Sequence, residues 1–338
     1  MTSIDPGTLK LLPHSIGDAD VRHFREQGFL AYRDALTQDE ISQSMDGLKV
    51  LVRRALDPES KFEWRQGNQD RARTYRGMLA KSPVGKFNID FEAGVDPRTL
   101  PPGEADGVAR NFNSFDGELP IYNYLGRQHP GIQGVLEGLL GPEVQFHSAM
   151  ALSKPAKIGG MKPWHQDVAY FSVGNWDGVC GVWIALDEAT VENGCMHVLP
   201  GGHKIGPLRH EHTQRDCEIA DKRLDPARTL AVPLPPGGIL FFHGMIPHFT
   251  GPIGETALVH CLTATSIIAL MEMTSAGRQP WPYLPQAYDF HNGKLWPNER
   301  PGLGVTLDSS KLQMVGDWTE HYAPIQLNHR PDGSYTNW

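Results

Sequence analysis

The stretch Lys162-Pro163-Trp164-His165-Gln166-Asp167 decides both the expected fold and the expected chemistry of this chain. On a β-strand, side chains two residues apart point to the same face, so His165 and Asp167 can reach one metal ion together. On a helix, residues at i and i+2 do not face each other. The motif therefore favours a strand that carries two ligands. Because a His-x-Asp sequence also occurs by chance, the rest of the chain must support this interpretation.

A third ligand is expected from a distant strand, and His248 is the candidate, 81 residues after Asp167. Two imidazoles and one carboxylate hold one face of an octahedral Fe(II) and leave the other positions open for a co-substrate and O₂. Three other histidines compete with it in principle as ligands: His197, His203 and His243.

The composition excludes several classes of function. With 31 Lys and Arg against 39 Asp and Glu, the net charge of -8 gives no electrostatic reason to expect nucleic acid or an anionic membrane as partner. The four cysteines form no Cys-x-x-Cys pair, so neither a zinc ribbon nor a disulfide framework is expected. We find no transmembrane segment and no leader sequence, and expect a soluble, cytoplasmic protein acting on a small-molecule substrate. The sequence contains no indication of an oligomeric state.

Residues 18–143 are expected to form a helical and loop layer. The patterns predict helices over 18–28, 36–56 and 132–140, with a short strand at 29–32. Thr37 and Glu40 have the spacing of a capping box at the start of the second helix. Residues 57–110 are polar and poor in periodicity, so we expect loops there, part of which could line the site.

From residue 144 the chain changes to short β segments bounded by Gly and Pro. Seven or more short strands after a helical region predict a mainly β fold with packed helices, a double-sheet sandwich or jelly roll. Residues 267–338 are rich in Pro, Trp and Gly, and we expect an extension of a single domain that spans 1–338. The expected strands are 144–153, 164–171, 181–186, 196–199, 230–232, 239–242 and 258–266.

Four segments together resemble the phytanoyl-CoA dioxygenase family of Fe(II)/2-oxoglutarate-dependent oxygenases. Their order and spacing match the family over roughly residues 20–265. The segments are FREQGFL (24–30), WHQDVAYF (164–171), VWIALDEATVENGCM (182–196) continuing as LPGGHK (199–204), and GGILFFHGMIPH (237–248).

The resemblance implies a double-stranded β-helix, a cupin-like jelly roll, with Fe(II) held by His165, Asp167 and His248. It also implies 2-oxoglutarate and O₂ as co-substrates, and hydroxylation of a small metabolite. The metal carries the hard chemistry, while the protein orients the substrate and excludes water. Asp167 keeps a carboxylate at the position where a halogenase would bind halide. Two alternatives remain open: an Fe(II) oxygenase that does not use 2-oxoglutarate, and a cupin-like binding protein without turnover.

The residues expected to bind the co-substrate match the family pattern less completely. By resemblance, Trp183 packs beside 2-oxoglutarate, Thr250 donates a hydroxyl to it and Lys154 is a possible counter-charge. The family places an Arg about ten residues after the distal His, yet residues 251–261 contain neither Arg nor Lys. Either another cation reaches the pocket, or Thr256 and His260 bind the carboxylate, or the co-substrate differs. The candidate cations are Lys154, Arg209, Arg278 and the arginines at 65, 71, 73 and 76.

Overall fold

The computed structural model describes residues 2–66, 77–101, 103–153, 161–170, 175–212 and 217–251, and the backbone of four short strands further on. Those four strands are β17 (Tyr288–His291), β18 (Lys294–Pro297), β19 (Asn328–His329) and β20 (Tyr335–Thr336). Within the described residues, no helix is long and apolar enough to cross a membrane.

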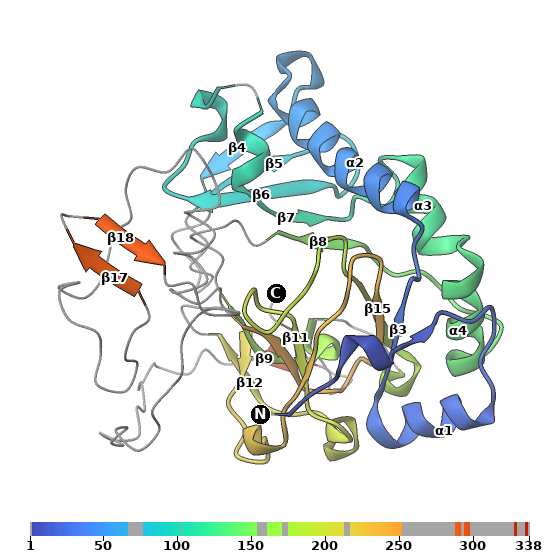
Figure 1. The fold of residues 1–338 in the computed structure, drawn as a ribbon. Helices are drawn as coiled ribbons and strands as arrows, with labels where there is room; N and C mark the ends of the chain where they lie inside the picture. Colours follow the sequence, from blue (N-terminus) through green and yellow to red (C-terminus); the bar gives the residue numbers. More distant parts are fainter. Residues whose placement is uncertain are drawn as a thin grey trace.

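Two β-sheets pack against each other over a shared apolar core (Figure 1). The first has the order β1-β14-β11-β16-β9 and the second the order β10-β15-β3-β2. This arrangement confirms the predicted jelly-roll class. The strands of the first sheet are β1 (Thr2–Ser3), β14 (Leu230–Val232), β11 (Met196–Val198), β16 (His248–Thr250) and β9 (Lys162–His165). Those of the second are β10 (Cys180–Ile184), β15 (Ile239–His243), β3 (Phe29–Arg33) and β2 (Lys10–Leu11).

The central strand β15 is apolar along most of its length because both of its faces are covered. Leu240 and Phe242 belong to the core between the two sheets, together with Met196 and Val198 of the opposite sheet. Ile239 and Phe241 point the other way, into a core shared with the helices. Alternate side chains of one strand therefore join the sheets to each other and to the helical layer.

Four helices are described before residue 141: α1 (Asp18–Gln27), α2 (Gln38–Leu56), α3 (Pro120–Arg127) and α4 (Pro130–Leu140). Three of them follow the expected patterns, and α3 was not predicted. At the start of α2, the Glu40 backbone donates to Thr37 Oγ1 at 3.3 Å and the Thr37 backbone donates to Glu40 Oε2 at 2.7 Å, so the predicted capping box is confirmed. Gly28 ends α1 with φ 85°, a left-handed conformation that suits glycine. Phe24 of α1 and Val135 of α4 pack on the second sheet.

The prediction of loops over residues 57–110 is wrong. Residues in this region form most of a five-stranded antiparallel sheet, and α2 and α3 pack on it (Figure 1). The missed pattern is the alternation of polar Asn88 and Asp90 with Ile89 and Phe91, both of which are fully buried. The strands are β4 (Glu63–Gln66), β5 (Gly77–Lys81), β6 (Asn88–Ala93), β7 (Ala109–Asn113) and β8 (Met150–Leu152).

The layers also divide the chain differently from the prediction. The strand expected over 144–153 is short, and as β8 it pairs with β7 rather than with a jelly-roll sheet. Conversely, β3 was assigned to the helical layer, but it pairs with β15 inside the jelly roll. The expected strand over 258–266 lies outside the described residues, as does most of the extension 267–338. The single domain over 1–338 stays a prediction.

Candidate metal centre

The first sheet brings the two halves of the expected motif together by pairing β9 with β16. His165, at the end of β9, lies directly opposite His248, at the start of β16. Residues directly opposite each other in an antiparallel pair have side chains on the same face. The two imidazole rings accordingly lie with their centroids 4.1 Å apart, and both side chains are buried.

Asp167 completes a cluster of three possible metal ligands. Its Oδ1 lies 3.6 Å from His165 Nε2 and 3.5 Å from His248 Nε2. The three candidate ligand atoms all lie within 4.8 Å of one another, and no other group of three in the described residues meets this criterion. Asp167 keeps 22% of its side chain exposed, so the cluster is buried on the imidazole side and reached from solvent on the carboxylate side.

Both histidines present the same ring nitrogen to the cluster because the backbone fixes their tautomers. His165 Nδ1 lies 2.8 Å from the Pro163 carbonyl and His248 Nδ1 lies 3.0 Å from the Ile246 carbonyl. A carbonyl only accepts, so each Nδ1 carries the proton and each Nε2 offers a lone pair. Burial and the neighbouring charges of His248 and Lys162 lower the pKa of His165 well below its ordinary value. This favours the neutral imidazole that binds a metal.

The expectation that His165 and Asp167 share one strand is wrong in detail. The strand ends at His165, and Asp167 begins a 3-10 turn, Asp167–Tyr170. The turn is held to the other sheet, since Val168 donates its backbone N–H to the Gly244 carbonyl at 3.2 Å. Asp167 therefore reaches the cluster from a turn whose position depends on this contact.

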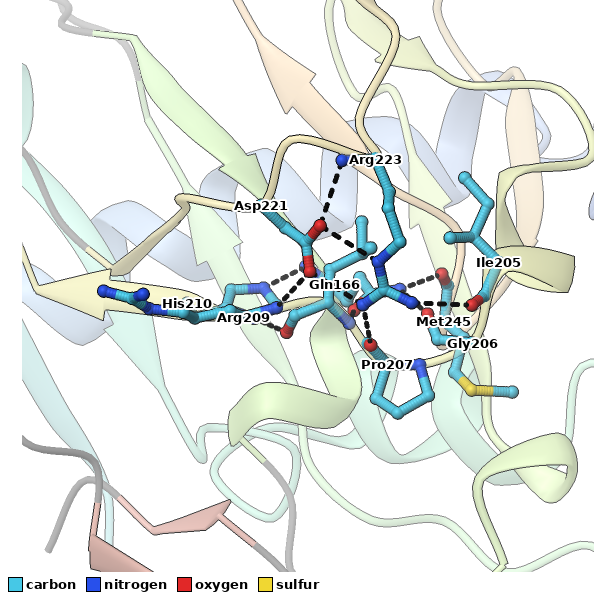
Figure 2. A network of polar contacts seen from close by, with 10 residues as sticks. Gln166, Ile205, Gly206, Pro207, Arg209, His210, Asp221, Arg223 and Met245 are labelled. Carbon is cyan, nitrogen blue, oxygen red and sulfur yellow. Dashed lines mark hydrogen bonds and ion pairs between the residues drawn. The ribbon is translucent and has the colours of Figure 1, made fainter.

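Gln166, the residue between the two predicted ligands, is fully buried and holds this turn in place (Figure 2). Its Nε2 donates to the Gly206 carbonyl at 3.0 Å and to the Met245 carbonyl at 2.6 Å. Its Oε1 accepts from the Leu208 backbone at 2.8 Å. Its own backbone N–H donates to His210 Nε2 at 3.0 Å. Every polar group of the side chain thus contacts a segment far away in sequence.

The segment around Gly206 and Leu208, which forms hydrogen bonds with Gln166, is itself held by Arg223 (Figure 2). The guanidinium donates to the Pro207 carbonyl at 3.0 Å and to Asp221 at 2.7 Å. Hydrogen bonds from Arg223 hold the pKa of Asp221 below its usual range. Sequence reasoning missed both Gln166 and Arg223 as parts of the site. For Gln166, the available indication was its place between two candidate ligands.

The predicted co-substrate residues divide into two that are described and two that are not. Trp183 packs with the core between the two sheets, on the inner face of β10. Thr250 is buried on β16, and its Oγ1 has no hydrogen-bond partner among the described residues. Lys154 and Thr256 lie outside the described residues, as do His260, Arg278 and the arginines at 71, 73 and 76.

The structure does not bring the other predicted cations or ligands to the cluster. Arg209 is 59% exposed and pairs with Glu211. Arg65 is likewise exposed and pairs with Glu63. Among the alternative histidines, His197 stacks on Phe249, while His203 and His243 lie against each other, and none of the three belongs to the cluster of Asp167.

The cluster lies within a domain that matches a known family. A model of the family described as phytanoyl-CoA dioxygenase (PhyH) matches residues 24–254. This range contains all four segments that carry the resemblance seen in the sequence, so that resemblance is confirmed.

Curated relatives match over most of their own length. A probable phytanoyl-CoA dioxygenase of Caenorhabditis elegans is 30% identical over 257 residues, which cover 70% of this chain and 71% of the relative. A phytanoyl-CoA dioxygenase domain-containing protein 1 homolog of Caenorhabditis briggsae is 25% identical and covers 81% and 98%, respectively. Among solved structures, EvdO2 from Micromonospora carbonacea var. aurantiaca is 24% identical with a TM-score of 0.47, covering 72% of this chain and 87% of that one.

Proposed function

Because the chain belongs to the phytanoyl-CoA dioxygenase family, we propose that His165, Asp167 and His248 hold Fe(II) and that the enzyme uses 2-oxoglutarate and O₂ to hydroxylate a small metabolite. Membership of the family confirms the prediction of a dioxygenase whose class uses Fe(II), 2-oxoglutarate and O₂. The roles of individual residues and this chain's own use of 2-oxoglutarate are part of the proposal.

One observation carries the assignment of the metal ligands: two imidazoles direct Nε2 at one carboxylate oxygen. Backbone carbonyls occupy both Nδ1 atoms, so the two lone pairs and the carboxylate converge. Two imidazoles and a carboxylate on one side are the ligand set of non-haem Fe(II) oxygenases. The donor atoms and their spacing therefore fit this ion.

The residues of the chain have separable tasks in such a reaction. Bound iron with a 2-oxo acid and O₂ supplies the oxidising power for attack on an unactivated C–H bond. His165 and His248 would hold the ion from the buried side of the cluster, and Asp167 would hold it from the side that solvent reaches. Trp183, on the inner face between the sheets, would exclude water beside the co-substrate.

The test of the proposal is anaerobic reconstitution with Fe(II), followed by addition of 2-oxoglutarate and then O₂. We expect a metal-to-ligand charge-transfer band on addition of 2-oxoglutarate, and succinate on addition of O₂. If the protein does not bind a stoichiometric amount of Fe(II), the assignment of the ligands is wrong.

A second candidate function is an Fe(II) oxygenase that does not use 2-oxoglutarate. It is favoured by one observation, the absence of Arg and Lys between residues 251 and 261. Iron-dependent O₂ uptake without succinate formation identifies this case. Iron binding with neither O₂ uptake nor succinate identifies a cupin-like binding protein. The cytoplasmic location stays a prediction.

A further inference from the structure

A dicarboxylic co-substrate needs a partner for the carboxylate that lies far from the iron. A carboxylate that is buried without a hydrogen-bonding or charged partner is strongly disfavoured. The stretch of sequence where an arginine is expected contributes no cation, because residues 251–261 lack both Arg and Lys. The partner must therefore come from another part of the chain.

An irregularity in the pairing of β9 with β16 turns one lysine toward the site. His165 pairs with His248, but Thr250 pairs with Lys162, so three steps along β9 match two steps along β16. Such a bulge places two residues of one strand opposite one residue of the other. In a regular ladder Lys162 would point away from the face that carries His165. The bulge instead places Lys162 directly opposite Thr250, on the face that also carries His248.

Two further contacts locate the end of the Lys162 side chain. Its Nζ donates to the Tyr170 hydroxyl at 3.1 Å. The Tyr170 ring in turn makes an edge contact with the His165 ring, with centroids 5.9 Å apart. The ammonium group therefore lies on the side of the candidate metal centre, near the end of the 3-10 turn that begins with Asp167.

Thr250, opposite Lys162, offers a buried polar group. Its side chain is 7% exposed, and its Oγ1 has no hydrogen-bond partner among the described residues. A buried hydroxyl without a partner is costly, so its presence points to a bound group that it satisfies. The inner face of the sheet thus carries an ammonium and a hydroxyl on directly opposed residues, beside the candidate ligands.

We propose that Lys162 binds the far carboxylate of 2-oxoglutarate, with the Thr250 hydroxyl donating to the same carboxylate, in place of the arginine that the sequence lacks. This inference rests on the proposed function, and it identifies a cation that sequence reasoning did not consider. Arg65 and Arg209, the described residues among the earlier candidates, are exposed and paired with glutamates. Lys162 binds as a point charge, and Tyr170 keeps it at the mouth of the site.

The experiment is an anaerobic titration of 2-oxoglutarate against the Fe(II)-loaded protein, read from the charge-transfer band. For Lys162→Met we expect the Kd to rise between tenfold and a hundredfold, because a charge-assisted hydrogen bond of roughly 1.5–3 kcal/mol is lost. Lys162→Arg should restore binding to within a few fold. Thr250→Val removes a neutral donor and should raise the Kd by about threefold to tenfold.

Two controls separate a direct contact from a general disturbance. Lys49→Met, which removes a lysine that pairs with Asp46 on the exposed surface of α2, should leave the Kd unchanged. The monocarboxylate 2-oxobutyrate has the same 2-oxo acid group and no far carboxylate. Its weak binding should be the same in the parent and in Lys162→Met, whereas a disturbed iron site would weaken both ligands.

The outcomes distinguish this inference from the proposed function. If the parent binds Fe(II) and 2-oxoglutarate and Lys162→Met binds both equally well, Lys162 is not the partner and the inference is overturned. An equal loss of 2-oxobutyrate and 2-oxoglutarate in that variant overturns it as well. A parent protein that binds Fe(II) without 2-oxoglutarate overturns the inference together with the leading function, and leaves the second candidate.

Discussion

Among the described residues, two pairs of buried histidines have their rings close together, and the pairs differ in the hydrogen bonds of their ring nitrogens. His165 and His248 have ring centroids 4.1 Å apart, and His203 and His243 have centroids 4.8 Å apart. Each pair has an aspartate nearby: Asp167 lies within 3.6 Å of both rings of the first pair, and Asp177 lies 3.6 Å from His243 in the second. By residue type and spacing, the two groups are almost the same.

The hydrogen bonds of the rings distinguish the two groups. In the first pair both Nδ1 atoms donate to carbonyls and both Nε2 atoms face Asp167. In the second, His243 Nδ1 accepts from the Met245 backbone, so its proton is on Nε2, toward Asp177. His203 Nε2 donates to the Arg25 carbonyl, which leaves its Nδ1 lone pair against Gly28.

A metal site therefore requires convergent lone pairs, and closeness of histidines is not enough. In the second pair, the His243 Nδ1 lone pair accepts from the Met245 backbone N–H, and the His203 Nδ1 lone pair is buried without a hydrogen-bond partner among the described residues. Asp177 is 83% exposed. The rings of this pair pack instead beneath α1, where Phe24 contacts His243. The same residue types are arranged as candidate metal ligands in one place and pack in a core in the other, because the backbone around them sets the tautomer.

The largest expected difference between the two pairs is in iron affinity. His165→Ala, Asp167→Ala or His248→Ala should each weaken Fe(II) binding by at least a hundredfold, about 2.7 kcal/mol, because a ligand is lost. His203→Ala and His243→Ala should bind Fe(II) as the parent does. Anaerobic equilibrium titration with Fe(II) measures both sets. If both groups of variants lost Fe(II) affinity equally, the proposed difference between the two histidine pairs would be wrong.

The hydrogen bonds of Gln166 allow a second test of how the first pair is organised. Gln166→Leu keeps the side-chain volume but leaves the Gly206 and Met245 carbonyls and the Leu208 N–H without their buried partner. We expect the free energy of unfolding to fall by roughly 2–4 kcal/mol and Fe(II) affinity to fall by about tenfold. Urea unfolding and metal titration report the two effects.

Gln43→Ala serves as the matched control for Gln166→Leu, because Gln43 is exposed on α2 and bonds only to the neighbouring Asp39 among the described residues. It should change neither quantity. Unfolding and metal binding of Gln166→Leu equal to those of the parent would show that the turn at Asp167 holds its position without these bonds.

The second pair should affect the pH dependence of folding stability rather than the binding of a metal. Burial, then the charge of His203, lowers the pKa of His243 to about 4 from an ordinary 6.5. Between these values the unfolded chain binds the proton and the folded chain does not, so folding stability falls as pH decreases. His243 alone should cost about 2 kcal/mol between pH 8 and pH 5, at 1.36 kcal/mol per pKa unit.

This pH effect is measured as the difference in unfolding free energy between pH 8 and pH 5 for the iron-free parent and for His243→Gln. The glutamine variant lacks the titrating ring and should lose correspondingly less stability over this range. An identical loss in both proteins would show that His243 does not titrate as its burial implies.

The smallest effect is expected at the second aspartate. Asp177→Asn should change iron affinity and unfolding free energy by less than about 0.5 kcal/mol, because its carboxylate is largely exposed and screened by solvent. The equivalent change at the first pair, Asp167→Asn, removes a charged ligand and should abolish stoichiometric binding of Fe(II). Titration of both variants with Fe(II) compares the same substitution, Asp to Asn, beside the two histidine pairs.

The local elements and the candidate ligands of the site were predictable from the amino-acid sequence. Helix α2 and its capping box follow from a pattern within twenty residues, and β15 follows from a short apolar run bounded by glycines. The alternation in β6 was also present in the sequence, so the sheet around it was predictable in part. Family resemblance then supplied His165, Asp167 and His248 by residue type and order.

The arrangement of these residues depends on contacts between distant segments of the chain. The bulge between β9 and β16 turns Lys162 to the inner face, and nothing within either strand alone specifies that register. Gln166 is held by carbonyls at residues 206 and 245, and His243 is kept from metal binding by the Met245 N–H. The physical reason is that a one-residue shift in strand pairing reverses the direction of every side chain, and pairing joins segments about eighty residues apart.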